Sequence, residues 1–277
     1  MLELTRQIWE GEDYVPGTWT DWMADPEGML TVAEYIARIV GLGKLTKLAD
    51  SDWWLEGLRV HPAYEGRGIA SRINDYLLAY WQRVDSGVIR LATISKREPV
   101  KYMVVKRGFK LIGEYAFFKT PFSKPGLPRP TKKIFESLTQ NDVDEALEWL
   151  TTPGKNRLDF GVMDLGWKFA LPRYEFVENY VEKKQIWWWQ GRLGLLVMVK
   201  KQDNSENFAR IRMLACDRKE YLTCLLDAHA FAQQQGYAGV TWKTPLLPGI
   251  QDELSMAGII QEKDYTLQIY EKSHAVE

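Results

Sequence analysis

The stretch His61-Pro62-Ala63-Tyr64-Glu65-Gly66-Arg67-Gly68-Ile69-Ala70-Ser71 decides how the first half of this chain folds. The run before it, residues 53–60, is aromatic and aliphatic, which is typical of a strand. The residues after it, as far as 84, carry apolar side chains spaced by threes and fours, which is typical of a helix with one buried face. A strand, a glycine turn and a helix N-terminus together expose unpaired backbone N–H groups and a partial positive charge. The stretch therefore predicts an anion-binding turn.

The composition is that of an ordinary globular protein. The chain has 277 residues, of which 45% are hydrophobic and 26% are charged, and this length allows two domains. Its net charge of −1 favours neither nucleic acid nor an anionic membrane as a partner. Two cysteines and three scattered histidines favour neither a disulfide framework nor a metal site. No apolar run reaches the roughly 18 residues that span a bilayer, so we expect a cytoplasmic protein without a bound metal.

A proline-rich segment marks the predicted domain boundary. Residues 121–130 hold four prolines and a glycine, which can continue neither a helix nor a central strand. We predict a linker over these residues, an N-terminal domain over residues 1–120 and a C-terminal domain over residues 131–277.

The two predicted domains repeat one order of elements. The N-terminal domain begins with a predicted helix over residues 2–10 and an aromatic loop over residues 14–22. Its further predicted strands and helices lie near residues 29–34, 37–47, 53–60, 69–82, 88–94 and 98–106. The predicted elements of the C-terminal domain lie near residues 135–150, 185–190, 193–200, 208–215, 221–235, 239–244, 251–257 and 265–270. The shared order of strand, helix and strand indicates a duplicated α/β unit.

The glycine turn resembles the GCN5-related N-acetyltransferase (GNAT) superfamily. The family signature is Gln/Arg-x-x-Gly-x-Gly/Ala after a strand that ends in Val-x-Pro. It maps onto residues 65–70 after Val60-His61-Pro62, and a Gly-Phe pair follows at residues 108–109. One position departs from the signature, because Glu65 stands where glutamine or arginine is usual. A carboxylate beside a phosphate is repulsive, so we expect Glu65 to point to solvent.

The resemblance implies the fold and the co-substrate. Through residues 10–28 and 53–62, it extends to the branch that contains vertebrate histidine N-acetyltransferase. It implies an α/β (α+β) fold of two tandem GNAT-like domains, each a mixed, mostly antiparallel central sheet flanked by helices. Acetyl-CoA is the implied co-substrate, and no metal is implied. Family members open with a strand, whereas this chain opens on a helical pattern. The first strand is thus expected to be missing or supplied by another segment.

The C-terminal domain resembles a second copy with an altered turn. Residues 214–226 occupy the place of the glycine turn and contain no glycine. Asp217 and Glu220 in this segment would repel a phosphate. The sequence therefore predicts that only the N-terminal copy binds the cofactor.

The resemblance assigns acetyl-CoA to two parts of the N-terminal domain. A strand backbone would pair with the pantetheine arm, and the amides of the glycine turn would hold the pyrophosphate. The predicted cofactor-binding residues are Leu58, Arg59, Val60, Glu65, Gly66, Arg67, Gly68, Ile69, Ala70, Ser71 and Arg97. The alternative for the turn is a tight strand-to-helix connection without a ligand. The alternative for Arg97 is a place on a solvated basic helix face.

Acetyl transfer needs a base that removes a proton from the amine. Glu56 is the predicted base, because its strand is expected to be buried on both sides, where an unpaired carboxylate is costly. In better-known relatives the glutamate lies about two residues earlier, and a strand bulge would reconcile the two positions. The alternative role of Glu56 is a structural ion pair with Lys44, Lys47 or Arg59.

The proton donor for the leaving thiolate is less clearly marked. Val104 occupies the position of the family's usual acid, a tyrosine four residues before the Gly-Phe pair. Tyr102 and Tyr115 are the tyrosines nearby in sequence, and Tyr102 is the predicted acid. A thiolate can also leave without a side-chain donor.

The predicted acceptor side is the aromatic loop. Tyr14, Trp19 and Trp22 would form an aromatic wall for a small amine. Asp13 or Asp21 would attract its positive charge. The alternative is that these aromatic side chains pack the loop onto the core.

The sequence predicts an N-acetyltransferase, which is an acyltransferase that moves an acetyl group from acetyl-CoA to a primary amine. The expected acceptor is a small molecule or a free amino acid. Two alternatives stay open: acetylation of a protein N-terminus or lysine, and an acetyl-CoA-binding module without catalysis. The amine substrate is the expected partner, with no nucleic acid and no membrane, and the protein is expected to be a monomer or a homodimer.

Overall fold

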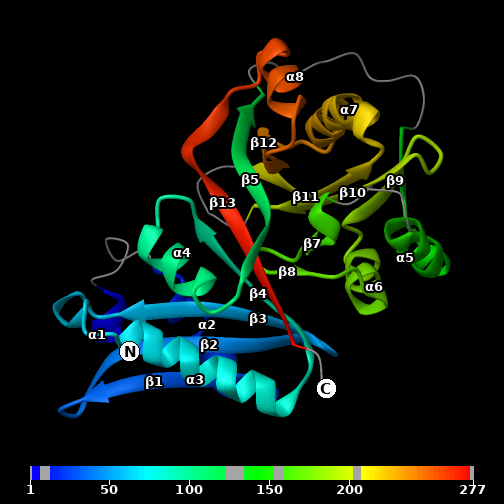
Figure 1. The fold of residues 1–277 in the computed structure, drawn as a ribbon. Helices are drawn as coiled ribbons and strands as arrows, with labels where there is room; N and C mark the ends of the chain where they lie inside the picture. Colours follow the sequence, from blue (N-terminus) through cyan, green and yellow to red (C-terminus); the bar gives the residue numbers. More distant parts are fainter. Residues whose placement is uncertain (1, 7–12, 123–133, 153–158, 202–206, 275–277) are drawn as a thin grey trace. The chain divides into compact units, whose positions relative to one another are not determined.

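The computed structural model describes residues 2–6, 13–122, 134–152, 159–201 and 207–274. The chain packs into two compact units, shown with their elements in Figure 1. The first unit comprises Met1–Ala92, Glu98–Lys110 and Tyr270–Glu277, and the second comprises Thr93–Arg97 and Leu111–Ile269.

The boundaries of these units differ from those of the predicted domains in two places. Residues 111–120 were expected in the N-terminal domain and belong to the second unit. Residues 270–274 were expected in the C-terminal domain and belong to the first. Each unit therefore contains a strand segment from the other half of the sequence. Of the predicted linker, residues 123–130 lie outside the described residues.

The first unit is a sheet covered by helices. Its strands follow the order β1-β2-β3-β4. Its elements are α1 (Leu2–Thr5), α2 (Val15–Ala24), β1 (Met29–Tyr35), β2 (Arg38–Ala49), β3 (Asp52–Val60), η2 (Pro62–Tyr64), α3 (Ile69–Val84), β4 (Gly87–Ile94) and α4 (Glu98–Val105). The apolar stripe of α3, with Ile73, Leu77 and Trp81, packs on the sheet through Leu45 and Ile89. Figure 1 shows α3 lying along the strands. The helix that follows the glycine turn is thereby confirmed.

The predicted aromatic loop is wrong in its secondary structure. Residues 15–24 form helix α2, and Pro16 lies in its first turn. A proline is tolerated there because its missing N–H has no intrahelical acceptor in any case. The adjacent Pro-Gly pair resembles a turn signal, which hid this helix from sequence reasoning.

The second unit contains a mixed sheet in the order β13-β5-β12-β11-β10-β9-β6 and a small sheet of β7 and β8. Its strands are β5 (Lys110–Pro121), β6 (Phe135–Ser137), β7 (Met163–Asp164), β8 (Phe169–Ala170), β9 (Ile186–Trp189), β10 (Gly194–Lys200), β11 (Phe208–Cys216), β12 (Gly239–Pro245) and β13 (Gln261–His274). Its helices are η3 (Gln140–Asp142), α5 (Val143–Thr151), η4 (Asp159–Gly161), α6 (Tyr174–Glu182), η5 (Arg218–Glu220), α7 (Tyr221–Gln234) and α8 (Ile250–Met256). The order β11-η5-α7-β12-α8 repeats β3-η2-α3-β4-α4 of the first unit. The predicted duplication of a mixed α/β unit is thus confirmed.

In the part of the chain that the structure describes, no helix is both long and apolar enough to cross a membrane.

Candidate functional site

The first candidate site lies where β3 and β4 part. The two strands pair in parallel at Asp52–Val88, Trp53–Ile89 and Trp54–Arg90. Beyond Trp54, the described residues of β3 have no partner on β4, whereas pairing with β2 continues to Val60. The backbone of β3 after Trp54 is therefore available on its β4 side, as the pantetheine-binding prediction requires.

A bulge in β3 follows directly after Glu56. Lys44 of β2 pairs with Glu56 and Leu42 pairs with Arg59, so two residues of β3 face one residue of β2. Gly57 in the bulge has a φ of +66°, and a Cβ there would lie 2.3 Å from the Trp22 ring. A glycine is needed both for this backbone conformation and for the close approach of the ring. The bulge that sequence reasoning invoked for Glu56 is present.

Glu56 is half-buried at this bulge, and it accepts a hydrogen bond of 2.7 Å from the Thr46 hydroxyl. The three cations considered as its ion-pair partners all pair with other carboxylates. Lys44 pairs with Asp25, Lys47 pairs with Glu27 and Asp50, and Arg59 pairs with Asp13. Both roles considered for Glu56, the base and a member of a structural ion pair, stay predictions.

Tyr14 lies against the same bulge. The residue is 49% exposed, and the Gly57 backbone N–H hydrogen-bonds its hydroxyl. Burial of the hydroxyl, followed by the negative charges of Glu56 and Asp13, raises the pKa of Tyr14 to about 12. The Arg59 guanidinium lies over the Tyr14 ring, 5.3 Å from its centroid. The structure thus brings together the predicted base and one predicted substrate residue.

The other acceptor-side predictions fare differently. Trp22 is buried and Trp19 is half-buried, and both pack in a cluster with Val15 and Leu42, as the core alternative predicted. Asp13 is buried and bidentate on Arg59, with both N–O distances 2.9 Å, so it is not free to attract an amine. The predicted aromatic wall is reduced to Tyr14.

The glycine turn opens α3 as predicted. Gly66 and Gly68 have φ values of +74° and +76°, and a Cβ at either would meet no atom within 4 Å. The backbone N–H of Arg72 donates to the Gly68 carbonyl at 3.1 Å, and this is the first backbone hydrogen bond of α3. The amides of Ile69 and Ser71 come before this bond and have no acceptor inside the helix. The turn therefore presents an open backbone surface lined with N–H groups.

Charged residues of the turn lie as the anion site requires. Glu65 is exposed, in agreement with the expectation that it points to solvent. Arg67 is also exposed, and its guanidinium lies 5.1 Å from the centroid of the Tyr64 ring. Of the predicted cofactor residues in β3, Leu58 and Val60 are half-buried in the strand that leads into the turn.

Arg107 holds the start of α3, a role that sequence reasoning missed. Its guanidinium donates to both carboxylate oxygens of Asp75 and, at 3.2 Å, to the carbonyl of Ser71. It also bonds the Met103 carbonyl at 2.9 Å, which ties α3 to α4. The position of Arg107 directly before Gly108 of the Gly-Phe pair was the available signal.

Two predicted residues are not brought to this site. Tyr102 is 72% exposed on α4, so its hydroxyl is in solvent, and no contact supports its role as acid. Arg97 is exposed in the turn after β4 and belongs to the second unit. Its contact with a CoA phosphate stays a prediction.

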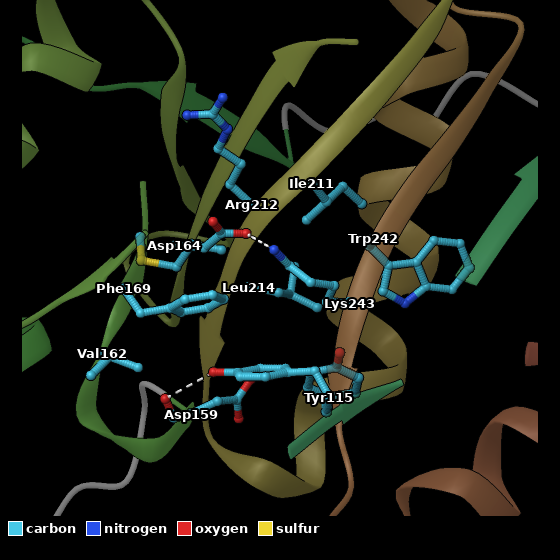
Figure 2. Close-up of a pocket in the computed structure, with 12 residues that line it drawn as sticks. Tyr115, Asp159, Val162, Asp164, Phe169, Ile211, Arg212, Leu214, Trp242 and Lys243 are labelled. Atoms are coloured by element: carbon cyan, nitrogen blue, oxygen red, sulfur yellow. Dashed lines mark hydrogen bonds and ion pairs between the residues drawn. The ribbon is translucent and has the colours of Figure 1, made fainter. Parts of the chain in front are cut away.

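The second unit has a corresponding divergence. Strands β11 and β12 pair in parallel at Phe208–Gly239, Ala209–Val240 and Arg210–Thr241, and the described residues show no pair beyond these. β11 also bulges, at Arg212, as the register with β10 shows. A pocket lies at this divergence, lined by Tyr115, Asp159, Val162, Asp164, Phe169, Ile211, Arg212, Met213, Leu214, Tyr221, Trp242 and Lys243 (Figure 2).

This second divergence contains buried charged side chains, and the turn beside it differs from the glycine turn. The Lys243 ammonium pairs with the Asp164 carboxylate, and burial lowers the pKa of Lys243. Tyr115, considered above with the first domain, lines this pocket of the second unit. The turn after β11 forms η5, where Arg218 pairs with Glu253 across 3.3 Å. It offers no glycine and no open anion seat like that before α3.

Comparisons with known proteins agree with this geometry. The model of the Acetyltransferase (GNAT) family matches residues 1–109. A human protein named probable N-acetyltransferase 16 is 27% identical over 120 residues, which are 40% of this chain and 32% of that protein. Histidine N-acetyltransferase of Xenopus tropicalis is 28% identical over 119 residues, 40% of this chain and 37% of that protein. The chain thus aligns with only about a third of the length of each of these relatives.

A solved structure extends the likeness over both units. A tandem GNAT protein from the clavulanic acid biosynthesis pathway, solved without acetyl-CoA, superposes with a TM-score of 0.55 at 13% identity. The superposition covers 96% of this chain and 97% of that one, and at this identity it shows the fold alone. The chain therefore has a tandem GNAT fold, and its residues 1–109 resemble the Acetyltransferase (GNAT) family.

Proposed function

We propose that this protein is an acyltransferase that moves the acetyl group of acetyl-CoA to a primary amine, and that the first unit holds acetyl-CoA. One coincidence carries the proposal. The divergence of β3 from β4, the bulge at Glu56 and the open glycine turn before α3 all lie in one unit. They also lie within residues 1–109, the part of the chain that matches the family.

The glycine turn fits a pyrophosphate. The space beside the Cα atoms of Gly66 and Gly68 is open, because a Cβ at either would meet no atom within 4 Å, so a ligand can approach the backbone amides. Each phosphate oxygen can accept hydrogen bonds from such amides, and the dipole of α3 adds a favourable potential. Arg67 and Arg72 are exposed beside the turn and supply charge-assisted contacts. Glu65 is exposed, which allows its carboxylate to turn away from the ligand into solvent.

The residues at the bulge fit the proton transfers of acetylation. Bound acetyl-CoA supplies an activated acetyl group as a thioester. Glu56, half-buried and bonded to the neutral Thr46 hydroxyl, is placed to accept the proton that the substrate ammonium must lose. Tyr14 holds its proton near neutral pH, because its pKa is about 12. Its position beside Glu56 at the bulge makes it a better candidate for the proton donor to the departing thiolate than the exposed Tyr102.

The acceptor we propose is a small amine or a free amino acid. The partial match to histidine N-acetyltransferase, an enzyme named for an amino-acid substrate, supports this class. The half-exposed ring of Tyr14 leaves one aromatic surface beside Glu56 for such a molecule. Acetylation of protein N-termini or lysines and binding without catalysis remain the competing functions.

The test is release of CoA thiol in the presence of candidate acceptors. The acceptor panel holds amino acids, polyamines, aminoglycosides and peptides with free N-termini. We expect thiol release that depends on one class of small amine and falls sharply in Glu56→Gln. Release with peptides alone would support the protein-directed alternative. Tight CoA binding with no amine-dependent release would support a binding module.

A further inference from the structure

The pocket of the second unit contains two carboxylates, and among the described residues one of them, Asp164, has an ion-pair partner and the other, Asp159, has none. The Asp164 carboxylate pairs with the Lys243 ammonium, which lies 4.9 Å from the centroid of the Phe169 ring and 5.2 Å from that of Trp167. This arrangement, a carboxylate with aromatic rings around an ammonium, is a known mode of cation recognition. The chain thus fills one end of the pocket with its own amine, as Figure 2 shows.

At the other end of the pocket, Asp159 provides a second carboxylate beside aromatic rings, but no lysine of the described residues pairs with it. Its carboxylate has no hydrogen-bond donor or ion-pair partner in the part of the chain that the structure describes. The nearest cation that influences it, Arg218, is itself paired with Glu253. Burial raises the pKa of Asp159 to about 7, and the charge of Arg218 lowers it only in part. A half-buried carboxylate without a counter-ion would be stabilised by a bound cation.

Asp159 is held in place by a strained turn. Phe160, directly after it, has a φ of +56°, which a residue other than glycine adopts at a cost. The Phe160 ring packs against Gly113, where a Cβ would lie only 2.3 Å from it, and meets the Tyr115 ring edge-on at 5.1 Å. The Tyr115 hydroxyl donates to the Asp159 backbone carbonyl at 3.3 Å. These contacts fix Asp159 beside the ring of Tyr115.

Two aromatic rings complete this end of the pocket. Tyr115 and Phe169 are stacked with centroids 5.6 Å apart, and both line the cavity with Asp159 (Figure 2). The cavity volume is about 30 Å³, enough for one or two waters or for an ammonium head group. A ligand would therefore insert one small charged end and leave the rest of its chain outside.

We propose that this pocket binds the ammonium group of a small primary amine, with Asp159 as its counter-ion and the rings of Tyr115 and Phe169 as its walls. The site lies wholly within the second unit and is separate from the acetyl-CoA site proposed in the first. The inference does not depend on acetyl transfer and can be tested without acetyl-CoA.

The test compares an amine with an alcohol of the same shape. The full-length protein is titrated with n-propylamine and with n-propanol, and binding is followed by ligand-observed NMR. At pH 8 we expect propylamine to bind at least ten times more tightly than propanol. Asp159→Asn, which keeps the shape of the side chain and removes its charge, should abolish this preference. Asp144→Asn, which removes an exposed carboxylate of the same unit, is the matched control and should leave it intact.

The pH profile gives a second readout that needs no variant. Propylamine stays charged over the range from pH 5 to 8, so its affinity should follow the ionisation of Asp159. We expect affinity to rise about tenfold per pH unit up to about 7 and then to level off. The other titratable or charged groups that line the pocket are Tyr115 on β5, Asp164 on β7, Arg212 on β11, Tyr221 on α7 and Lys243 on β12, and the charge of Arg218 on η5 also acts on Asp159. Both tyrosines stay neutral in this range, because burial raises the pKa of each above its ordinary value.

Equal binding of propylamine and propanol to the wild-type protein would overturn the proposal. The same conclusion would follow if Asp159→Asn, shown to be folded by circular dichroism, bound propylamine as tightly as the wild type. A failure of thiol release in the first unit would leave these results unaffected.

Discussion

The two units contain the same strand–turn–helix–strand motif, and they differ in what occupies the place where the parallel strands part. In the first unit, β3 leads through a glycine turn into α3, and Glu56 lies at a bulge just beyond the last β3–β4 pair. In the second unit, β11 bulges at Arg212, and Lys243, Asp164 and aromatic rings fill the divergence. Glu56 and Arg212 each lie two residues after the last parallel pair.

This difference leads us to propose that the second unit retains the GNAT framework without a cofactor site. The geometry of diverging strands is a property of the sheet, and both units have it. Phosphate binding depends on small features of the turn, namely glycines with positive φ and free amides. At the corresponding turn of the second unit, Arg218 of η5 pairs with Glu253, and a Lys243–Asp164 pair lies in the pocket at the divergence.

The two units also differ at the first residue pair of their parallel strands, before the strands part. In the first unit, Asp52 and Arg90 are buried and paired at 2.7 Å, and Arg90 also bonds Glu271 of β13 at 2.8 Å. In the second unit, the buried Phe208 takes the place of Asp52 in the first parallel pair. A buried ion network thus holds the last strand segment in the first unit, while apolar packing supports the second.

The largest expected effect tests this contrast in stability. Asp52→Asn leaves the Arg90 guanidinium buried with half of its charge compensation, and removing one partner of a buried pair costs about 3–5 kcal/mol. We expect a loss of this size in the free energy of unfolding, measured by urea titration. Glu27→Gln, at an exposed ion pair, is the control and should change it by less than about 1 kcal/mol. If Asp52→Asn changed the free energy of unfolding as little as the control does, the Asp52–Arg90–Glu271 network would not be needed for stability.

A pH effect of similar size is expected in the second unit alone. Burial lowers the pKa of His229 from 6.5 to about 4, so the folded protein excludes a proton that the unfolded chain binds. Stability should therefore fall as pH drops from 6.5 to 4, by on the order of 3 kcal/mol from this residue. Asp159 has the opposite sign, because its raised pKa makes stability fall as pH rises from 3.8 to about 7.

The comparison of wild type with His229→Phe isolates the histidine contribution. The His229 ring lies 4.7 Å from Trp242, so tryptophan fluorescence reports unfolding around it. We expect the difference in urea midpoint between the two proteins to change with pH between 6.5 and 4. A constant difference over this range would mean that His229 titrates normally.

Glu56→Gln should lower kcat by about 10² or more, because general-base catalysis typically contributes 10²–10⁴. The Kd for CoA and the fold should be unchanged, since Glu56 contacts the Thr46 hydroxyl and not the glycine turn. The loss should shrink at high pH, where more of the amine is already neutral. If Glu56→Gln unfolds while turnover per folded molecule is unchanged, Glu56 is structural and the base lies elsewhere.

Gly68→Asp should weaken CoA binding by more than about 30-fold, or about 2 kcal/mol. Its side chain would place a Cβ and a negative charge at a position with a φ of +76° that faces open space. Gly191→Asp is the matched control, since Gly191 also has a positive φ and open surroundings but lies in the second unit. Both variants are titrated with CoA by calorimetry. Equal affinities of the two variants would show that the glycine turn is not part of the CoA site.

Local patterns in the sequence predicted most of the strands and the glycine turn. They failed where a local signal was ambiguous, as in α2, where Pro16 and Gly17 resemble a turn and are in fact part of a helix. They also failed where pairing is long-range. Nothing in the alternation of β5 or β13 indicates which sheet each strand joins, so the exchange of strand segments between the units was missed.

The candidate site was predictable to the extent that it depends on the turn. The bulge at Gly57 was anticipated only through the position of Glu56, and the roles of Arg107 and Asp13 depend on partners distant in sequence. The second pocket could not be predicted, because Asp159, Tyr115 and Lys243 come from segments that only the fold brings together.

The central claim is that one unit binds acetyl-CoA and the other does not. The most direct measurement is the stoichiometry of CoA binding to the full chain by isothermal titration calorimetry. The account predicts one site per chain, lost in Gly68→Asp and retained in Gly191→Asp and Lys243→Met. Two sites of similar affinity, or one site that survives Gly68→Asp and disappears in Lys243→Met, would contradict it.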